Sequence, residues 1–235
     1  MPSVSSPATR YGVHHVQLAR AVFGAIAALM ITFSSDHSAS VGLSVFSGFA
    51  IATGLIWGLS AWLVFPRAQR GTAVLLAVVS ILAGMTAGIL TLRSITLFFV
   101  VVAAWLLITG VIEAIAGARA LRSARAGDAA HTRTAPVRAH ARDALTLGVI
   151  TVVAGVGMLL VPWGYSLEYT VPGAPTPFTL TGIIIGVGIF GAYTAIVAVF
   201  LAIAGLSPRP AEAPVLATAD EAASGIATAR AEESA

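Results

Sequence analysis

The chain has 235 residues, of which 57% are hydrophobic and 10% are charged, and its formal net charge is +3. Soluble domains usually contain about 25% charged residues, so this composition excludes an ordinary soluble domain and predicts an integral membrane protein. The absence of cysteine excludes disulfides, thiolate metal sites and thiol catalysis. All the basic residues are arginines, and their position beside apolar runs reflects membrane topology, which gives no reason to expect a nucleic-acid partner.

Six apolar runs predict six membrane-spanning helices after a polar cytoplasmic arm, residues 1–15. The first run is the least regular, because Gln17 and Arg20 leave only 13 residues, 21–33, free of amide or charge. A cleaved signal peptide is therefore an alternative interpretation of this segment. Within a membrane domain of residues 16–206, the predicted spans are 16–33, 41–65, 72–91, 95–118, 144–161 and 178–206.

The arginines lie mostly on one side of the predicted bundle. Six lie in the connector 119–142, which lacks apolar periodicity and is expected to be solvated, whereas the opposite side has only Arg93. Because arginine and lysine are retained on the cytoplasmic side, both termini are expected in the cytoplasm. Residues 207–235, rich in alanine, proline and acids without an apolar face, predict a disordered cytoplasmic tail.

The spans form three consecutive pairs that resemble one another, which predicts an all-α membrane bundle of three tandem helical hairpins. The segments ATGLIWGLSAW (52–62), ITGVIEAIAGA (108–118) and IFGAYTAIVAV (189–199) align without gaps. In this alignment Trp57 and Thr194 occupy the position of Glu113, so only the middle repeat carries an acid. The aligned glycines are Gly54, Gly110 and Gly191.

Small residues spaced four apart recur in these spans and predict close contacts between helices, because small side chains let membrane helices approach one another. The predicted pairs are Gly54 and Gly58, Gly84 and Gly88, Gly110 and Ala114, and Gly182 and Gly186.

Glu113 is the one carboxylate inside a predicted span, so it is the main candidate for function. An ionisable group within the membrane is costly and usually faces the interior of a bundle. On a helical wheel Glu113 shares its face with small residues such as Gly110 and Gly117, and this face is expected to meet protein. The opposite, lipid-facing side is expected to carry Val101, Trp105, Ile108, Ile112 and Ile115.

Two roles for Glu113 follow from its place near the cytoplasmic end of the span. One is structural, a buried acid paired with Arg20, Arg70 or Arg142, or hydrogen-bonded to Thr109. The other is a protonatable group that changes its charge, and with it the packing of the bundle, on acidification.

The run Gly110-Val111-Ile112-Glu113-Ala114-Ile115-Ala116-Gly117-Ala118-Arg119, within three tandem hairpins, resembles the HdeD family of small bacterial inner-membrane proteins. The resemblance covers about residues 15–206 and is strongest over 80–122. It implies a multi-pass inner-membrane location and, from some members, a role in acid resistance. The chain departs from the family in lacking proline in the turn 92–94, in its long loop 162–177 and in its tail.

Polar and aromatic residues outside the spans are weaker candidates. Asp36, His37 and Glu168 lie on the side opposite the arginines and are candidates for sensing pH, or are simply solvated. His14 and His15 lack further ligands, so no metal site or other cofactor is predicted. Aromatic residues near span ends are expected at the membrane interface, with an aromatic ligand cage as the alternative for the outer loop. They are Trp62, Trp163, Tyr165 and Tyr169.

The function predicted from these features is a non-enzymatic, stress-related membrane protein, because the chain has no phosphate loop, nucleophile elbow or zinc-protease motif in a usable context. A small transporter, channel or proton-coupled carrier using Glu113 is one alternative. An accessory subunit of a larger membrane complex is another. The lipid bilayer is the expected partner, together with a second copy of the chain or another membrane protein.

Overall fold

The computed structural model describes residues 12–65, 67–126, 134–170 and 177–207. Most of the predicted N-terminal arm (residues 1–11), the middle of the basic connector (127–133) and almost all of the predicted disordered tail (208–235) lie outside the described residues.

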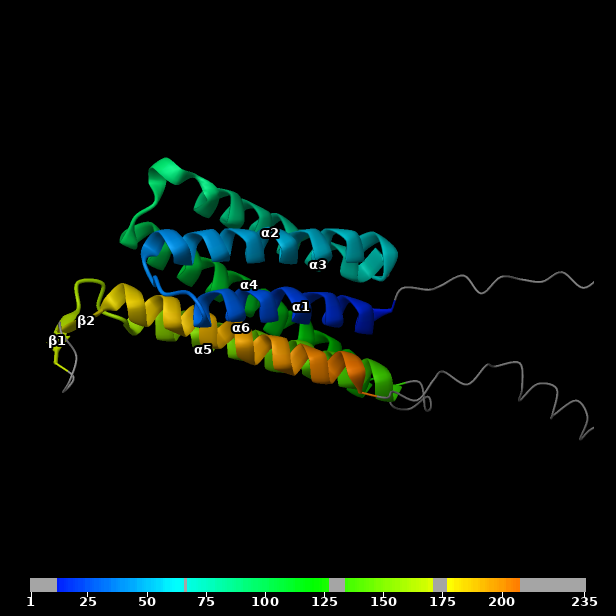
Figure 1. The fold of residues 1–235 in the computed structure, drawn as a ribbon. Coiled ribbons are helices and arrows are strands. Elements are labelled where there is room, and N and C mark those ends of the chain that lie inside the picture. Colours follow the sequence, from blue (N-terminus) through cyan, green and yellow to red (C-terminus); the bar gives the residue numbers. More distant parts are fainter. Residues whose placement is uncertain (1–11, 66, 127–133, 171–176, 208–235) are drawn as a thin grey trace, which may run out of the picture.

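Six long helices and one short β-hairpin make up the described fold (Figure 1). All six helices are long and apolar enough to cross a membrane, which confirms the predicted all-α bundle and fits a multi-pass membrane protein. In chain order the elements are α1 (Val13–Thr32), α2 (Ala39–Leu63), α3 (Arg67–Gly88), the 3-10 turn η1 (Leu90–Leu92), α4 (Ile95–Ala126), α5 (Thr134–Leu160), β1 (Ser166–Tyr169), β2 (Phe178–Thr181) and α6 (Gly182–Leu206).

Several helix boundaries differ from those expected from hydropathy. The helix α4 continues to Ala126 and α5 already begins at Thr134, so much of the expected connector is helical. Alanine and arginine are strong helix formers and carry α4 past its apolar part. Residues 178–181, expected at the start of span six, instead form β2, paired antiparallel with β1 from Tyr169↔Phe178 to Ser166↔Thr181. That pairing satisfies backbone groups before α6 begins.

The two ends of the bundle are distinct. We call the end where α1 begins and α6 ends the terminal end, and the opposite end, which carries β1 and β2, the hairpin end (Figure 1). The arginine-rich ends of α4 and α5 lie at the terminal end, whereas Arg93 lies at the hairpin end.

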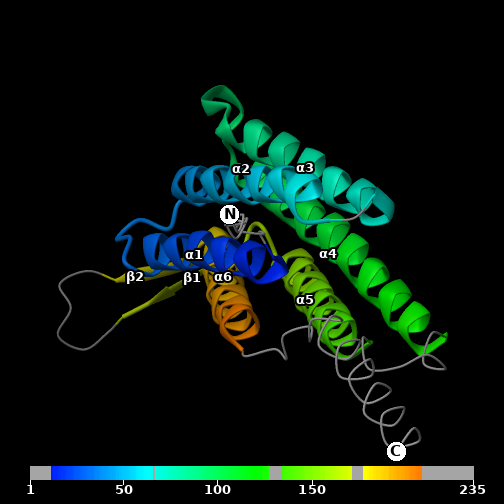
Figure 2. The ribbon, with the colours of Figure 1, turned by 90° about the vertical axis from the view of Figure 1, so that its right-hand side faces the viewer.

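The closest helix packing occurs between hairpins rather than within them. The tightest pairs are α2 with α3, α4 with α5, and α6 with α1, so the three hairpins close into a ring (Figure 2). The aligned glycines of the repeats lie in these contacts. Methyl groups added at Gly54, Gly110 and Gly191 would lie only 2.7, 2.8 and 2.8 Å from atoms of α3, α5 and α1. The repeat therefore encodes the contact from each hairpin to the next.

The other small residues expected in helix contacts face neighbouring segments at different distances. Gly84 and Gly88 face α2, and Gly186 faces two phenylalanine rings of α4. Gly58 faces α3 at an ordinary contact distance of 3.8 Å from an added methyl group, and Gly182 lies against the segment before β1. Ala114 faces Gly148 of α5.

Aromatic side chains fill the core in the half of the bundle nearer the hairpin end. Phe46 and Phe190 are fully buried, and their ring centroids are 5.6 Å apart in an edge-on arrangement. Phe49 packs in the same way against Phe190, at 5.8 Å. The indole of Trp105 joins this group, 5.5 Å from Phe46 and 5.7 Å from Phe49. We call these four side chains the aromatic seal.

The prediction that Trp105 lies on the lipid-facing side of α4 is wrong. Trp105 is 4% exposed and points into the bundle, whereas Ile108 and Ile115 are exposed as expected. Its Nε1 donates a hydrogen bond to Ser80 Oγ of α3 at 3.0 Å. A buried indole requires an acceptor for its N–H, and Ser80 on the neighbouring helix supplies one.

Candidate functional site: a buried ion pair in a polar chamber

Glu113 and Arg20 form a short ion pair inside the bundle. An Nη2 hydrogen of Arg20 is donated to Glu113 Oε1 at 2.8 Å, and the two side chains are only 12% and 6% exposed. Arg20 comes from α1 and Glu113 from α4, so the pair connects two different hairpins. A charge buried in the membrane interior is stable only with such a partner.

The structure selects Arg20 among the partners expected for Glu113. Arg70 instead donates from Nε to the carbonyl of Phe65, and its guanidinium lies 5.5 Å from the ring centre of Trp62. Arg142 is exposed on α5. A hydrogen bond between Thr109 and Glu113 was the alternative to an arginine partner, but Thr109 Oγ1 donates to the carbonyl of Trp105 at 2.6 Å.

Trp57 completes the environment of the guanidinium. The Arg20 Cζ atom lies 4.7 Å from the centre of the Trp57 ring, within the range of a cation–π interaction. Trp57 was not predicted to act with Glu113, although the repeat alignment contained the signal, because both occupy the same position in their repeats. The ring of three hairpins brings these equivalent positions to the same arginine.

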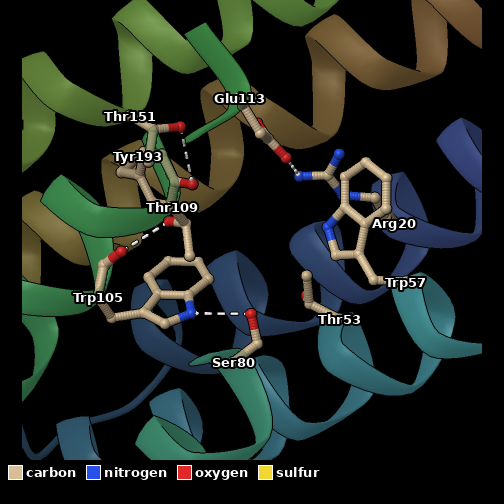
Figure 3. Close-up of a pocket in the computed structure, with 9 residues that line it drawn as sticks. All are labelled: Arg20, Thr53, Trp57, Ser80, Trp105, Thr109, Glu113, Thr151 and Tyr193. Atoms are coloured by element: carbon tan, nitrogen blue, oxygen red, sulfur yellow. Dashed lines mark hydrogen bonds and ion pairs between the residues drawn. The ribbon is translucent and has the colours of Figure 1, made fainter. Parts of the chain in front are cut away.

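The ion pair lies in a small polar chamber to which all six helices contribute (Figure 3). The open space among the lining side chains has room for about one water molecule. Sequence analysis missed most of the lining, because single serines and threonines in a span resemble many others. The lining residues are Arg20, Thr53, Trp57, Ser80, Trp105, Thr109, Glu113, Thr151 and Tyr193.

Hydrogen bonds connect several of the lining helices. Thr151 Oγ1 of α5 and the Tyr193 hydroxyl of α6 are 3.2 Å apart, and Thr151 also donates to the carbonyl of Leu147. Three residues before Arg20 on α1, Gln17 donates to Asp143 Oδ2 of α5 at 3.3 Å. Thr194, the third counterpart of Glu113, donates instead to the carbonyl of Gly191.

The weaker acidic and histidine candidates lie at the hairpin end, away from the chamber. Asp36 accepts hydrogen bonds from the backbone N–H and hydroxyl of Ser38, the N-cap residue of α2, at 2.8 and 2.9 Å. Glu168 is exposed on β1 opposite Thr179. Among the described residues no group of three or more acidic or histidine side chains lies close enough to share a metal ion, so these three are not gathered into such a site.

The predicted interfacial aromatic residues are partly or largely exposed. Trp62 is exposed near the terminal end, and Trp163, Tyr165 and Tyr169 are exposed at the hairpin end. Trp163 stacks on Phe99 at 5.7 Å and Tyr169 stacks on Phe178 at 5.8 Å. These contacts leave one face of each ring for the surroundings, as in an interfacial position.

The chemistry available in the polar chamber is that of one ion pair and several hydroxyl groups. No cluster of three or more His, Cys, Asp or Glu side chains in the described part of the chain lies in a position to hold a metal ion. The rings of His14 and His15 lie 3.9 Å apart in a tilted arrangement at the start of α1. Comparison of the chain with protein families, with curated proteins and with solved structures found no match.

Proposed function

We propose that this chain is a non-enzymatic inner-membrane protein of the bacterial envelope or acid-stress response, as its resemblance to the HdeD family implies, with a cytoplasmic terminal end. In this proposal the Arg20–Glu113 ion pair connects α1 to α4 while Glu113 is ionised, and acid acts on the bundle by breaking this pair. The observation that carries it is the 2.8 Å ion pair between α1 and α4, buried where all six helices meet.

Acid acts on this pair through the carboxylate. Protonation of Glu113 removes its negative charge and leaves the Arg20 guanidinium buried without a counter-ion. Breaking a buried pair on one side costs about 3–5 kcal/mol, which is a large fraction of the roughly 5–15 kcal/mol by which folded proteins are stable. The bundle would respond by moving α1 relative to α4, because only a more solvated position satisfies the guanidinium.

The surroundings of Glu113 favour a response governed by one pair. Arg20 of α1 and the hydroxyl group of Tyr193 of α6 are the charged and titratable groups that line the chamber with it. The α5 lining residue, Thr151, is neutral, and Asp143 of α5 contacts Gln17 instead. The helices α2 and α3 contribute only neutral lining side chains.

Survival of bacteria after acid shock tests this function. We expect cells that produce the wild-type chain to survive better than cells without it, and Glu113→Gln to lose this protection. The double variant Arg20→Gln/Glu113→Gln removes both charges, so it should fold but still fail to protect. Glu168→Gln, which changes an exposed acid at the hairpin end, is the matched control.

Two results would overturn the proposal. One is equal survival with and without the wild-type chain, which removes the acid role. The other is full protection by a folded double variant, which shows that the pair is dispensable for the response.

A transporter, channel or proton-coupled carrier using Glu113 is less well supported. The chamber has room for about one water molecule, and the aromatic seal lies between it and the hairpin end. Proton flux into proteoliposomes that disappears in Glu113→Gln would favour the carrier and replace the proposed role. Copurification of a stoichiometric membrane partner in mild detergent would favour the accessory subunit.

A further inference from the structure

The polar chamber contains a buried hydroxyl group that has no partner. Thr53 of α2 is 2% exposed, and its Oγ1 makes no hydrogen bond in the structure. The side chain lines the chamber between Trp57 and Ser80 (Figure 3). An unsatisfied buried hydroxyl typically costs about 1–3 kcal/mol, and ordered water is the usual remedy in protein interiors.

We propose that this chamber is a water-binding site, centred on Thr53 Oγ1, that opens toward the terminal end of the bundle and is closed toward the hairpin end. The size and the chemistry of the lining both fit water. The space holds about one molecule, and a buried water needs two to four polar partners. Thr53 and the neighbouring Ser80 hydroxyl offer two of them, and the Glu113 carboxylate lines the same space.

Charge argues against an ionic ligand. The guanidinium of Arg20 is already neutralised by Glu113 at 2.8 Å, so the chamber has no excess positive charge for an anion. Glu113 is the one carboxylate in the lining, and it is engaged by that guanidinium, which leaves a cation without ligands. A small neutral molecule that both donates and accepts hydrogen bonds is what remains, and water is the molecule of that size.

The chamber is closed on one side by the aromatic seal. Phe46 and Phe190 are 0% exposed, and the edge-on contacts of Phe49 and Trp105 join them into one packed layer. The four rings come from α2, α4 and α6 and lie about two to three helical turns from the hairpin end of those helices, so the layer lies between Thr53 and that end. The phenylalanine rings offer water no hydrogen-bond partner on the hairpin side of the chamber.

The exposed fraction of the lining side chains increases in the other direction. Thr53 and Ser80 are almost completely buried, whereas the Arg20 side chain is 12% exposed and Trp57 is half-buried. Trp57 lies six residues before the end of α2, about 9 Å from it by helical rise, and Thr53 lies one turn deeper. Water would therefore enter past Arg20 and Trp57, from the side that the arginine distribution predicts to be cytoplasmic.

Cysteine accessibility tests the site directly, because the natural chain has no cysteine and any labelling reports the introduced thiol. Thr53→Cys places a thiol at the proposed site. Thr194→Cys is the matched control, since Thr194 is a fully buried threonine that does not line the chamber. Silver(I), an ion small enough to follow water, is added to one face of oriented membrane vesicles. Thiols that remain free are then labelled with a maleimide after denaturation.

We expect silver(I) to abolish the later labelling of Thr53→Cys when it is added at the face of the terminal end, and not when it is added at the other face. Labelling of Thr194→Cys should be retained from both faces. Protection of Thr53→Cys from the hairpin face, protection from neither face, or equal protection of the control would each overturn the proposal.

If Thr53→Cys does not fold, Ser80→Cys replaces it, because Ser80 lines the same chamber and cysteine is close to serine in size. The inference does not depend on an acid-stress role. If the thiol is protected as expected but the chain has no effect on acid survival, the water site stands and the proposed function is wrong. If the chain protects cells from acid but the thiol is not protected as expected, the proposed function stands and the water site is wrong.

Discussion

Trp57 and Glu113 occupy the same position in two repeats, and both contact the guanidinium of Arg20. The carboxylate lies 2.8 Å from the Arg20 Nη2 atom, and the indole ring centre lies 4.7 Å from Cζ. A symmetric pore would place three equivalent side chains around an axis, but here the first two repeats supply different partners for one charge. The third repeat has Thr194, which bonds its own helix. The three repeats therefore have the same helical arrangement, but the side chains at this equivalent position differ and make different contacts.

The ion pair should dominate the stability of the bundle. We expect Glu113→Gln and Arg20→Gln each to lower the free energy of unfolding by about 3–5 kcal/mol, because each leaves one buried charge or its partner unpaired. The double variant should lose less than either single variant. Unfolding by sodium dodecyl sulfate in mixed micelles measures all four proteins, and additive losses would contradict a direct interaction.

Acidification should reproduce part of the effect of Glu113→Gln in the wild-type chain. The ion pair contributes stability while the carboxylate is ionised, and this contribution is lost when a proton is bound. We expect the thermal unfolding temperature in detergent to depend more strongly on acidic pH in the wild-type chain than in the double variant Arg20→Gln/Glu113→Gln. Parallel pH profiles of the two proteins would show that other groups control acid stability.

The cation–π contact should be measurable apart from the ion pair. Trp57→Leu is expected to lose about 0.5–2 kcal/mol through its contact with Arg20, in addition to any loss of apolar packing. A cycle of Trp62→Leu with Arg20→Gln is the control, because the Trp62 ring lies beside Arg70 and not beside Arg20, so its coupling to Arg20 should be near zero. A double-variant cycle with Arg20→Gln isolates the contact, and a coupling energy near zero would exclude it.

The contact between α4 and α5 should tolerate no added methyl group at Gly148. Such a group would lie 2.7 Å from both Ala114 Cα and the carbonyl oxygen of Gly110. We expect Gly148→Ala to destabilise the fold by about 1–3 kcal/mol through overpacking. Gly157→Ala in the same helix meets nothing within 4 Å and should be neutral or stabilising. Equal thermal stability of the two variants would contradict this close approach.

Arg93 should hold the turn between α3 and α4 against α2. Its Nη1 donates to Ser44 Oγ at 2.8 Å and lies 3.2 Å from Ser40 Oγ. We expect Arg93→Ala to increase hydrogen exchange of backbone amides in η1 and in the first turn of α2, without changing exchange around Glu113. Arg67→Ala, at the exposed start of α3, controls for the loss of a positive charge. Unchanged exchange in η1 would show that the turn is held by its backbone alone.

Hydropathy and residue spacing were sufficient to predict the number of spans and to predict that Glu113 faces the interior of the bundle. Long apolar runs have few alternatives to a membrane helix, because every backbone polar group must be satisfied within the segment. The same reasoning failed for Trp105, which a wheel placed toward lipid. A buried indole N–H needs a hydrogen-bond acceptor, and the acceptor for Trp105 is Ser80 of another helix. A helical wheel represents one helix alone, so it could not show that this acceptor was available.

The sequence by itself determined the six helices, the repeat of three hairpins and the single acid that one of them carries, because these are properties of local composition and period. Only the tertiary structure decided which arginine meets Glu113 and which helices pack most closely. Both depend on how the hairpins close into a ring. In that ring the last helix, α6, packs against the first helix, α1, although they lie at opposite ends of the membrane domain in the sequence. Arg20 and Glu113 are 93 residues apart in the chain, and it is this closure that brings them within 2.8 Å.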